Sequence, residues 1–175
     1  DVEHAGEDRA PPLALARIRT VRRQSLVVGP RDPENVGADE VAAGGPLPFT
    51  QQDVRLSGHA IECRITSEDP FNGFLPSTGR IDHLTLPAGP GVRWDGGVAQ
   101  GSVVGLHYDP LLAKLVVHAP TRAAAIERMA RARDELVLTG VQTSASFHRR
   151  VMDEPDFRAG RLSIRYVEEH PGLTD

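Results

Sequence analysis

Apolar and polar residues alternate strictly over residues 59–66, where HAIECRIT places Ile61, Cys63 and Ile65 on one face. Alternation with a period of two is typical of a strand that is buried on one side. The segment that follows, residues 67–79, contains two prolines and several turn residues, which predict a loop. By the same criteria we expect further strands within residues 79–87, 91–97, 101–110 and 111–119.

The apolar spacing changes after residue 120. Over residues 121–140 the apolar residues recur on one helical stripe, with Thr121 as the N-cap and Gly140 as the C′ residue. The stripe consists of Ile126, Met129, Ala130, Leu136 and Val137. This pattern predicts one long amphipathic helix.

A second helix is expected over residues 142–154, with Thr143 or Ser144 as its cap and Phe147 and Val151 on its apolar face. Residues 156–160 then predict a turn, and residues 162–172 a last short strand or extended segment. Strands followed by helices favour an α+β fold, with a small antiparallel sheet followed by two packed helices. No internal repeat is visible.

The N-terminal part of the chain has a different character. Residues 13–24, LALARIRTVRRQ, could form one amphipathic helix, or a marginal helix beside a flexible linker. Residues 29–48 are rich in glycine, proline and charge, and such a stretch buries too little apolar surface to offset its ordering entropy. We therefore expect a flexible segment at residues 1–45 and one folded domain at residues 46–175.

Composition excludes several classes of protein. The chain has 175 residues, with 20 Lys and Arg against 24 Asp and Glu, which gives a net charge of −4. A mildly acidic chain is a poor candidate for binding nucleic acid. The sequence contains no apolar run long enough to span a membrane, and its charged N-terminus lacks the apolar core of a signal peptide. These features predict a cytoplasmic protein without a membrane partner.

One segment stands out as a candidate anion-binding site. Arg93 lies in GPGVRWDGG, where glycines permit tight turns. If this segment is a strand, Arg93 and Trp94 point to opposite faces of it. A guanidinium beside such a turn can bind a small planar anion with two hydrogen bonds. The alternative is an exposed arginine beside a core tryptophan. The segment is not a phosphate-binding loop, because no Gly-Lys-Ser/Thr follows it.

Other chemically capable residues favour structural interpretations. The single cysteine, Cys63, cannot form an internal disulfide and is predicted to be a core residue rather than a nucleophile. The pair Glu68–Asp69 is expected to face water, and the segment 148–150, His-Arg-Arg, to form a solvated helix face. None of the seven histidines shows the spacing of a helical metal site, so no metal ligands are assigned. No nucleophile–base pair can be assembled.

A family resemblance adds what these residues do not supply. The run GHAIECRITSEDPFNGFLPSTGRI resembles the biotin carboxylase C-terminal domain. The resemblance continues through GVRWD, HYDPLLAKLVVHAPTRAAAIERM, DELVLTGVQTS and LSIRYVEEHPG, in the family's order and spacing. It covers about residues 42–175, and residues 1–40 match nothing in the family.

The resemblance implies a reaction and its components. In this family ATP, with Mg²⁺ or Mn²⁺, activates bicarbonate, and CO₂ passes to biotin on a biotin carboxyl carrier protein. Carboxyltransferase subunits, as in acetyl-CoA carboxylase of fatty acid biosynthesis, propionyl-CoA carboxylase or pyruvate carboxylase, complete the enzyme. The family also forms homodimers partly through this domain. Arg93 matches the arginine that contacts bicarbonate and biotin, Ile164 an apolar residue against adenine, and Arg165 a position near the adenine.

The departures from the family are equally informative. The sequence has no ATP-grasp domain, no glycine-rich phosphate loop, and no E-M-N-x-R-x-Q-V-E-H run with its metal-binding and catalytic residues. We therefore expect the C-terminal part of a biotin carboxylase, an ATP-dependent ligase, that is inactive as an isolated chain and binds none of the cofactors tightly. The alternative is a non-catalytic dimerisation or interaction module.

Overall fold

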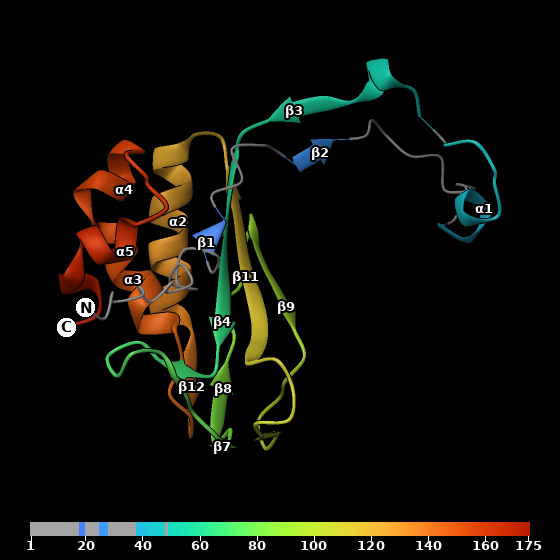
Figure 1. The fold of residues 1–175 in the computed structure, drawn as a ribbon. Coiled ribbons are helices and arrows are strands. Elements are labelled where there is room, and N and C mark those ends of the chain that lie inside the picture. Colours follow the sequence, from blue (N-terminus) through green and yellow to red (C-terminus); the bar gives the residue numbers. More distant parts are fainter. Residues whose placement is uncertain (1–17, 20–24, 28–37, 48) are drawn as a thin grey trace, which may run out of the picture.

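A four-stranded antiparallel sheet forms the centre of the computed structural model, which describes residues 18–19, 25–27, 38–47 and 49–175. Its strand order is β1 (Ile18–Arg19), β4 (His59–Thr66), β11 (Leu111–Ala119) and β9 (Val92–Gly96). The two long strands β4 and β11 run side by side through the middle (Figure 1). The strands expected at residues 59–66, 91–97 and 111–119 are confirmed.

Short two-stranded ladders surround this sheet. Two of them, at the end of the sheet near residue 66, pair β7 (Gly79–Arg80) with β10 (Val103–Val104) and β8 (His83–Thr85) with β12 (Val137–Thr139). The others pair β5 (Glu68–Asp69) with β6 (Leu75–Pro76) and β2 (Ser25–Val27) with β3 (Arg55–Ser57). The single strand expected at residues 79–87 is therefore divided, because β7 and β8 pair with different partners.

Helices cover one face of the sheet (Figure 1). The layer consists of α2 (Arg122–Glu135), α3 (Ala145–Asp153), α4 (Pro155–Ala159), α5 (Tyr166–Glu169) and the 3-10 helix η3 (Pro171–Leu173). Two further short helices, α1 (Ala38–Ala42) and the 3-10 helix η2 (Gln51–Asp53), precede β3. The fold is thus α+β, an antiparallel sheet followed by packed helices, as the sequence predicts.

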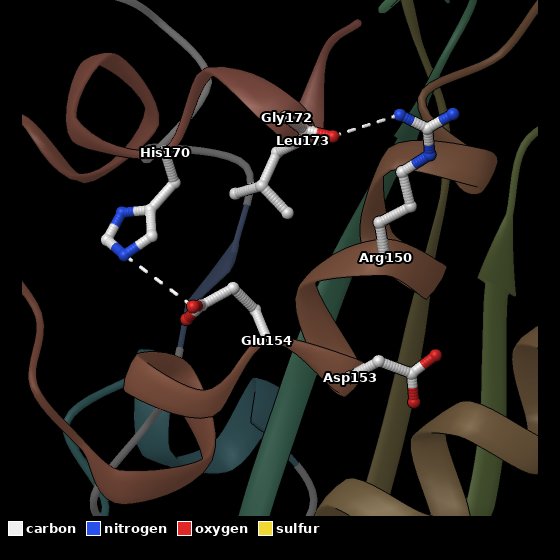
Figure 2. Close-up of a pocket in the computed structure, with 6 residues that line it drawn as sticks. All are labelled: Arg150, Asp153, Glu154, His170, Gly172 and Leu173. Atoms are coloured by element: carbon white, nitrogen blue, oxygen red, sulfur yellow. Dashed lines mark hydrogen bonds and ion pairs between the residues drawn. The ribbon is translucent and has the colours of Figure 1, made fainter.

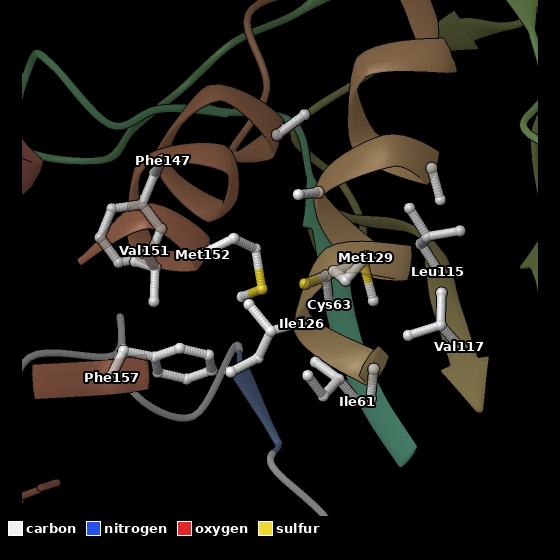
Figure 3. Close-up of a cluster of buried hydrophobic side chains, with 14 of the residues drawn as sticks. Ile61, Cys63, Leu115, Val117, Ile126, Met129, Phe147, Val151, Met152 and Phe157 are labelled. Carbon is white, nitrogen blue, oxygen red and sulfur yellow. The ribbon is translucent and has the colours of Figure 1, made fainter. Parts of the chain in front are cut away.

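The core lies between the sheet and the two longest helices (Figure 3). Ile61, Cys63 and Ile65 of β4 are fully buried there, as the period of two predicts. They face α2 and α3, which contribute Ile126, Met129, Phe147, Val151 and Met152. Each such side chain contributes about 1.5–3 kcal/mol through the removal of apolar surface from water. The prediction that Cys63 is a core residue is confirmed.

The first long helix is shorter than expected. Thr121 is its N-cap, and its hydroxyl accepts a hydrogen bond from the Ala124 N–H at 3.2 Å. The helix ends at Glu135, however, because the next residues form β12 and pair with β8. Placing Val137 on the helical stripe was therefore wrong. Gly140 does take a left-handed conformation, with φ of 101°, but it follows β12 and is not the C′ residue of the helix.

Three other segments differ from expectation. Residues 156–160 belong mainly to α4 rather than a turn, because Glu154 caps the helix and Pro155 starts it with a preset φ. Residues 166–169, expected to be extended, form α5. Within residues 13–24, expected to be helical, Ile18–Arg19 pair with β4 as a strand, and the other residues lie outside the described part.

Two polar residues expected in solvent are buried. His148 is fully buried in α3. Its burial is tolerated because its Nε2 forms a hydrogen bond of 2.9 Å with the backbone carbonyl oxygen of Arg64 in β4. Glu68 is only 6% exposed, in the short strand β5 that pairs with β6. The periodic spacing of apolar residues in a helix or strand does not show which polar residues are buried in contacts between two elements.

The predicted division between residues 1–45 and 46–175 stays a prediction. Most of residues 1–37 lie outside the described part of the chain, and α1 is the main described element before residue 45. Within the described residues, no helix is both long enough and apolar enough to cross a membrane.

Candidate functional site

The sheet face opposite the helices carries the candidate site, and we call it the open face. It is formed by every second residue of the three long strands, which point away from the core. They are Ala60, Glu62 and Arg64 of β4, Lys114, Val116 and His118 of β11, and Arg93 and Asp95 of β9. The β4 and β11 residues are half-buried, and the two β9 residues are exposed.

Two cations lie directly opposite each other in the centre of the open face. Lys114 is paired in register with Arg64 on one side and with Asp95 on the other. Like charges directly across a strand pair are destabilising unless something compensates them. Within the described residues, neither the Arg64 guanidinium nor the Lys114 ammonium forms a hydrogen bond or ion pair with a side chain. The Asp95 carboxylate, in register with Lys114, supplies part of that compensation, and an anion bound beside Arg64 would add to it.

Arg93 lies on the same face, at its edge. Its side chain is 69% exposed, and its Nε donates to the Asp95 carboxylate at 3.1 Å. Trp94 and Val92 point to the other side and pack against the core. Arg93 and Trp94 therefore lie on opposite faces of β9, as predicted. The preceding turn needs its glycines, because a Cβ on Gly91 would lie 2.4 Å from the His118 carbonyl oxygen.

The N-terminus of α3 holds the strand that carries Arg64. The Ser144 hydroxyl donates to the Arg64 carbonyl at 3.1 Å and accepts from the Thr66 N–H at 3.0 Å. The Ser144 N–H in turn donates to the Thr66 carbonyl at 3.0 Å. Together with His148, these contacts fix the backbone beneath Arg64. Such support reduces the entropy lost when a side chain orders around a ligand.

The two residues expected on the adenine side lie in a different layer. Ile164 is 83% exposed in the loop before α5, and Arg165 immediately precedes that helix. The Arg165 guanidinium lies 3.7 Å from Glu169 and 3.9 Å from Glu168. Since α5 belongs to the helical layer, these residues and Arg93 lie on opposite sides of the sheet (Figure 1). The domain by itself does not bring them together.

Cys63 has no part in this chemistry. Burial raises the pKa of its thiol to about 12, so the nucleophilic thiolate does not form at neutral pH. Its sulfur lies in the core beside Ile126 and Met129 (Figure 3).

A second polar cluster lies at the far edge of the helical layer. Glu154, Asp156 and His170 place one ligand-type atom each within 4.8 Å of the others. A cavity of about 440 Å³ borders the cluster and is also lined by Arg150, Asp153, Gly172 and Leu173 (Figure 2). The sequence spacing of these residues gave no sign of a site, because α4 and α5 bring the histidine back to the two carboxylates.

Comparison with known proteins places the fold. The model of the biotin carboxylase C-terminal domain family matches residues 62–169. The chain belongs to this family. It is 42% identical to biotin carboxylase of Haemophilus influenzae over 135 residues, which is 77% of this chain and 30% of that protein. It is 46% identical to the chloroplastic biotin carboxylase of Arabidopsis thaliana over 130 residues, 74% of this chain and 24% of that protein.

Solved structures of biotin carboxylases agree. The biotin carboxylase domain dimer of Hydrogenobacter thermophilus 2-oxoglutarate carboxylase, in complex with ADP, Mg²⁺ and bicarbonate, superposes with a TM-score of 0.76. The two sequences are 40% identical, and the match covers 78% of this chain and 30% of the Hydrogenobacter chain. The biotin carboxylase subunit of a pyruvate carboxylase gives the same TM-score at 42% identity, over 78% of this chain and 30% of that protein. This chain thus spans under a third of the length of each of these relatives.

Proposed function

We propose that this chain is the C-terminal part of a biotin carboxylase, whose open face binds the anion during ATP- and bicarbonate-dependent carboxylation of biotin. The single observation that carries the proposal is the position of Arg64 directly opposite Lys114, with Arg93 on the same face. The complex of the Hydrogenobacter relative with bicarbonate supports the choice of anion.

The chemistry of the face suits a small planar oxyanion. A guanidinium presents a rigid fork of donors and stays charged at any working pH, whereas the lysine ammonium adds a point charge. We propose that Arg64 and Lys114 hold bicarbonate at the centre of the face and that Arg93 contacts it or the biotin ureido oxygen from the edge. Cations fixed where negative charge develops lower the barrier to carboxyl transfer.

The cofactors of the reaction fit this domain only in part. Ile164 offers an exposed apolar surface to one side of an adenine ring, and Arg165 a charge beside it. The open face itself offers two carboxylates, Glu62 and Asp95, and the glycine-containing turn before β9 lacks the Gly-Lys-Ser/Thr run of a phosphate-binding loop. ATP and its Mg²⁺ or Mn²⁺ are therefore assigned to a preceding ATP-grasp domain, which supplies phosphoryl transfer, while this domain closes the site. The carrier protein and carboxyltransferase are the partners this function requires.

A graft tests the proposal. Residues 50–175 replace the corresponding part of the Haemophilus influenzae biotin carboxylase, and the rate of biotin carboxylation is measured. We expect an active graft in which Arg64→Ala and Arg93→Ala each lower kcat/KM for bicarbonate by about tenfold to a thousandfold. Lysine keeps the charge but loses the fork, so neither Arg64→Lys nor Arg93→Lys restores the rate.

Arg131→Ala is the matched control, because Arg131 is an exposed arginine on α2, in the helical layer, paired with Glu135. An active graft in which the Arg64 and Arg93 variants behave like this control contradicts the assignment. A reduced rate in one variant alone identifies which arginine contacts the anion. The isolated chain is expected to release no phosphate from ATP in a bicarbonate-dependent way, and measurable release would contradict the need for the ATP-grasp domain.

The alternative function is a dimerisation module. It is favoured by one observation, that the Hydrogenobacter relative forms a biotin carboxylase domain dimer. An inactive graft together with tight pairing of the isolated chain would favour this alternative.

A further inference from the structure

The three polar residues at the edge of the helical layer come from three successive parts of the chain. Glu154 joins the end of α3 to the start of α4, Asp156 lies in α4, and His170 follows α5. Figure 2 shows His170 and Glu154 turned toward each other beside the cavity. None of the three lies on the open face, so the cluster has no part in the proposed anion site.

The histidine ring is oriented by a backbone carbonyl. Its Nδ1 lies 2.7 Å from the carbonyl oxygen of Tyr166, which can only accept, so Nδ1 carries a proton. The other nitrogen, Nε2, lies 3.1 Å from Asp156 Oδ2 and 3.6 Å from Glu154 Oε1. In the neutral ring, Nε2 thus directs a lone pair toward two carboxylate oxygens. Such an arrangement of acceptors is stable only with a positive charge between them, either a proton on Nε2 or a metal ion.

The outward oxygens of both carboxylates are already held. Glu154 Oε2 accepts from the Phe157 N–H at 2.8 Å and from the Tyr166 hydroxyl. Asp156 Oδ1 accepts from Arg161 Nε, also at 2.8 Å. These donors leave Glu154 Oε1 and Asp156 Oδ2 to face His170. In metal centres, outer-shell partners of this kind fix the orientation of the ligands.

The two separations from the imidazole nitrogen are close to those around a small tetrahedral ion, and all three ligand atoms lie within 4.8 Å of one another. Zinc bonds to nitrogen and oxygen of about 2.0–2.1 Å place neighbouring ligand atoms about 3.3 Å apart in a tetrahedron. The observed separations from His170 Nε2, 3.1 and 3.6 Å, lie on either side of this value. The adjoining cavity, lined by Glu154 and His170, gives solvent access and space for water as the fourth ligand.

We propose that Glu154, Asp156 and His170 bind one divalent transition-metal ion of the Zn²⁺ type. The imidazole ligand selects against Mg²⁺ and Ca²⁺, which prefer oxygen ligands only. The bound ion ties the residue after α5 to the start of α4. It thereby fixes both ends of the segment 157–169, which carries Ile164 and Arg165. The competing occupant of the same position is a proton on His170 Nε2.

Metal titration of the purified full chain distinguishes the two occupants. After dialysis against EDTA, the chain is titrated with Co²⁺, whose visible absorption reports its coordination, and its melting temperature is measured with Zn²⁺. We expect saturation at one Co²⁺ per chain, competition by Zn²⁺, and a melting temperature that rises with Zn²⁺ concentration. Mg²⁺ and Ca²⁺ are expected to have no effect.

Two variants remove a ligand, His170→Gln and Asp156→Asn, and the control is Asp153→Asn. Asp153 lines the same cavity but pairs with Arg149, outside the cluster. Losing an outer-shell partner costs roughly 10–100-fold in metal affinity, so loss of a ligand should weaken Co²⁺ binding by at least as much. The control should bind as the unmodified chain does. Absent saturable binding, or binding unchanged in both ligand variants, overturns the proposal and assigns the position to a proton.

Discussion

The Nε2 atom of His148 lies 2.9 Å from the backbone carbonyl oxygen of Arg64, although 84 residues separate them. The imidazole is fully buried, and it joins α3 to the strand whose side chain at residue 64 faces the opposite side of the sheet. The helical layer therefore fixes the backbone of a residue whose side chain lies on the open face.

This relationship predicts a large stability loss for His148→Ala. The substitution removes a buried hydrogen bond and leaves a cavity, which together should cost about 2–4 kcal/mol. For a chain of this size, the melting temperature should fall by roughly 5–15 °C. His83→Ala is the control, because His83 is exposed, and it should change stability by less than about 0.5 kcal/mol. Equal melting temperatures for the two variants would contradict the structural role of His148.

Gly140→Ala should be more damaging than another left-handed glycine substitution. A Cβ on Gly140 would lie 1.9 Å from the Arg80 carbonyl oxygen, and φ there is 101°. Gly160 also has positive φ, 77°, but nothing lies within 4 Å of its added Cβ. Denaturant unfolding should give a loss of about 3 kcal/mol or more for Gly140→Ala and about 1–2 kcal/mol for Gly160→Ala. Similar losses would show that strain in φ, rather than the backbone clash, decides both.

The buried thiol predicts a loss of stability in alkali. Because the pKa of Cys63 is raised to about 12 in the folded chain, the unfolded chain loses this proton first, near its ordinary pKa of 9. Between these values the folded state binds more protons, so stability falls as pH rises, by up to about 1.4 kcal/mol per pH unit. Below pH 8 the thiol does not change how the free energy of unfolding depends on pH. Urea unfolding at several pH values should show that the free energy of unfolding falls less steeply in alkali for Cys63→Val than for the unmodified chain. Parallel pH dependences for the two proteins would contradict this prediction.

The isolated chain is expected to self-associate. Val103, Leu106 and Tyr108 are 72%, 69% and 90% exposed, and large apolar side chains exposed to this extent favour association. Sedimentation velocity should show a coefficient that increases over the micromolar concentration range, at low and at high salt, because apolar contacts are not screened. A single monomeric species throughout this range would count against the prediction and against the dimerisation alternative.

Residues with strong local patterns were predicted correctly. The alternation of Ile61, Cys63 and Ile65 defines a half-buried strand because side chains on a strand point to opposite faces in turn. Thr121 was assigned as an N-cap because a hydroxyl can accept from the first free N–H groups of a helix. Both features depend on neighbours within a few residues, and sequence spacing displays them directly.

Features that depend on distant partners were missed. Val137 continues the helical stripe, but pairing with Thr85 on β8 draws it into a strand. Glu154 and His170 lie 16 residues apart and meet only because α4 and α5 fold back. Arg64 was visible on the polar face of its strand, but its position opposite Lys114 needed the register of β11. The roles of Arg93, Ile164 and Arg165 stay predictions.

Strand β4 faces the core on one side and the proposed anion site on the other, and mutational tolerance along it should alternate accordingly. Odd-numbered positions from 61 to 65 face the core, so a library selected only for soluble expression should reject most changes there. Even-numbered positions from 60 to 64 face outward, so the same selection should accept many changes at these sites. A second selection, for growth dependent on carboxylation by the graft, should reverse that permissiveness at residue 64. The two selections together would therefore separate folding from the proposed function along one strand, by residue parity alone.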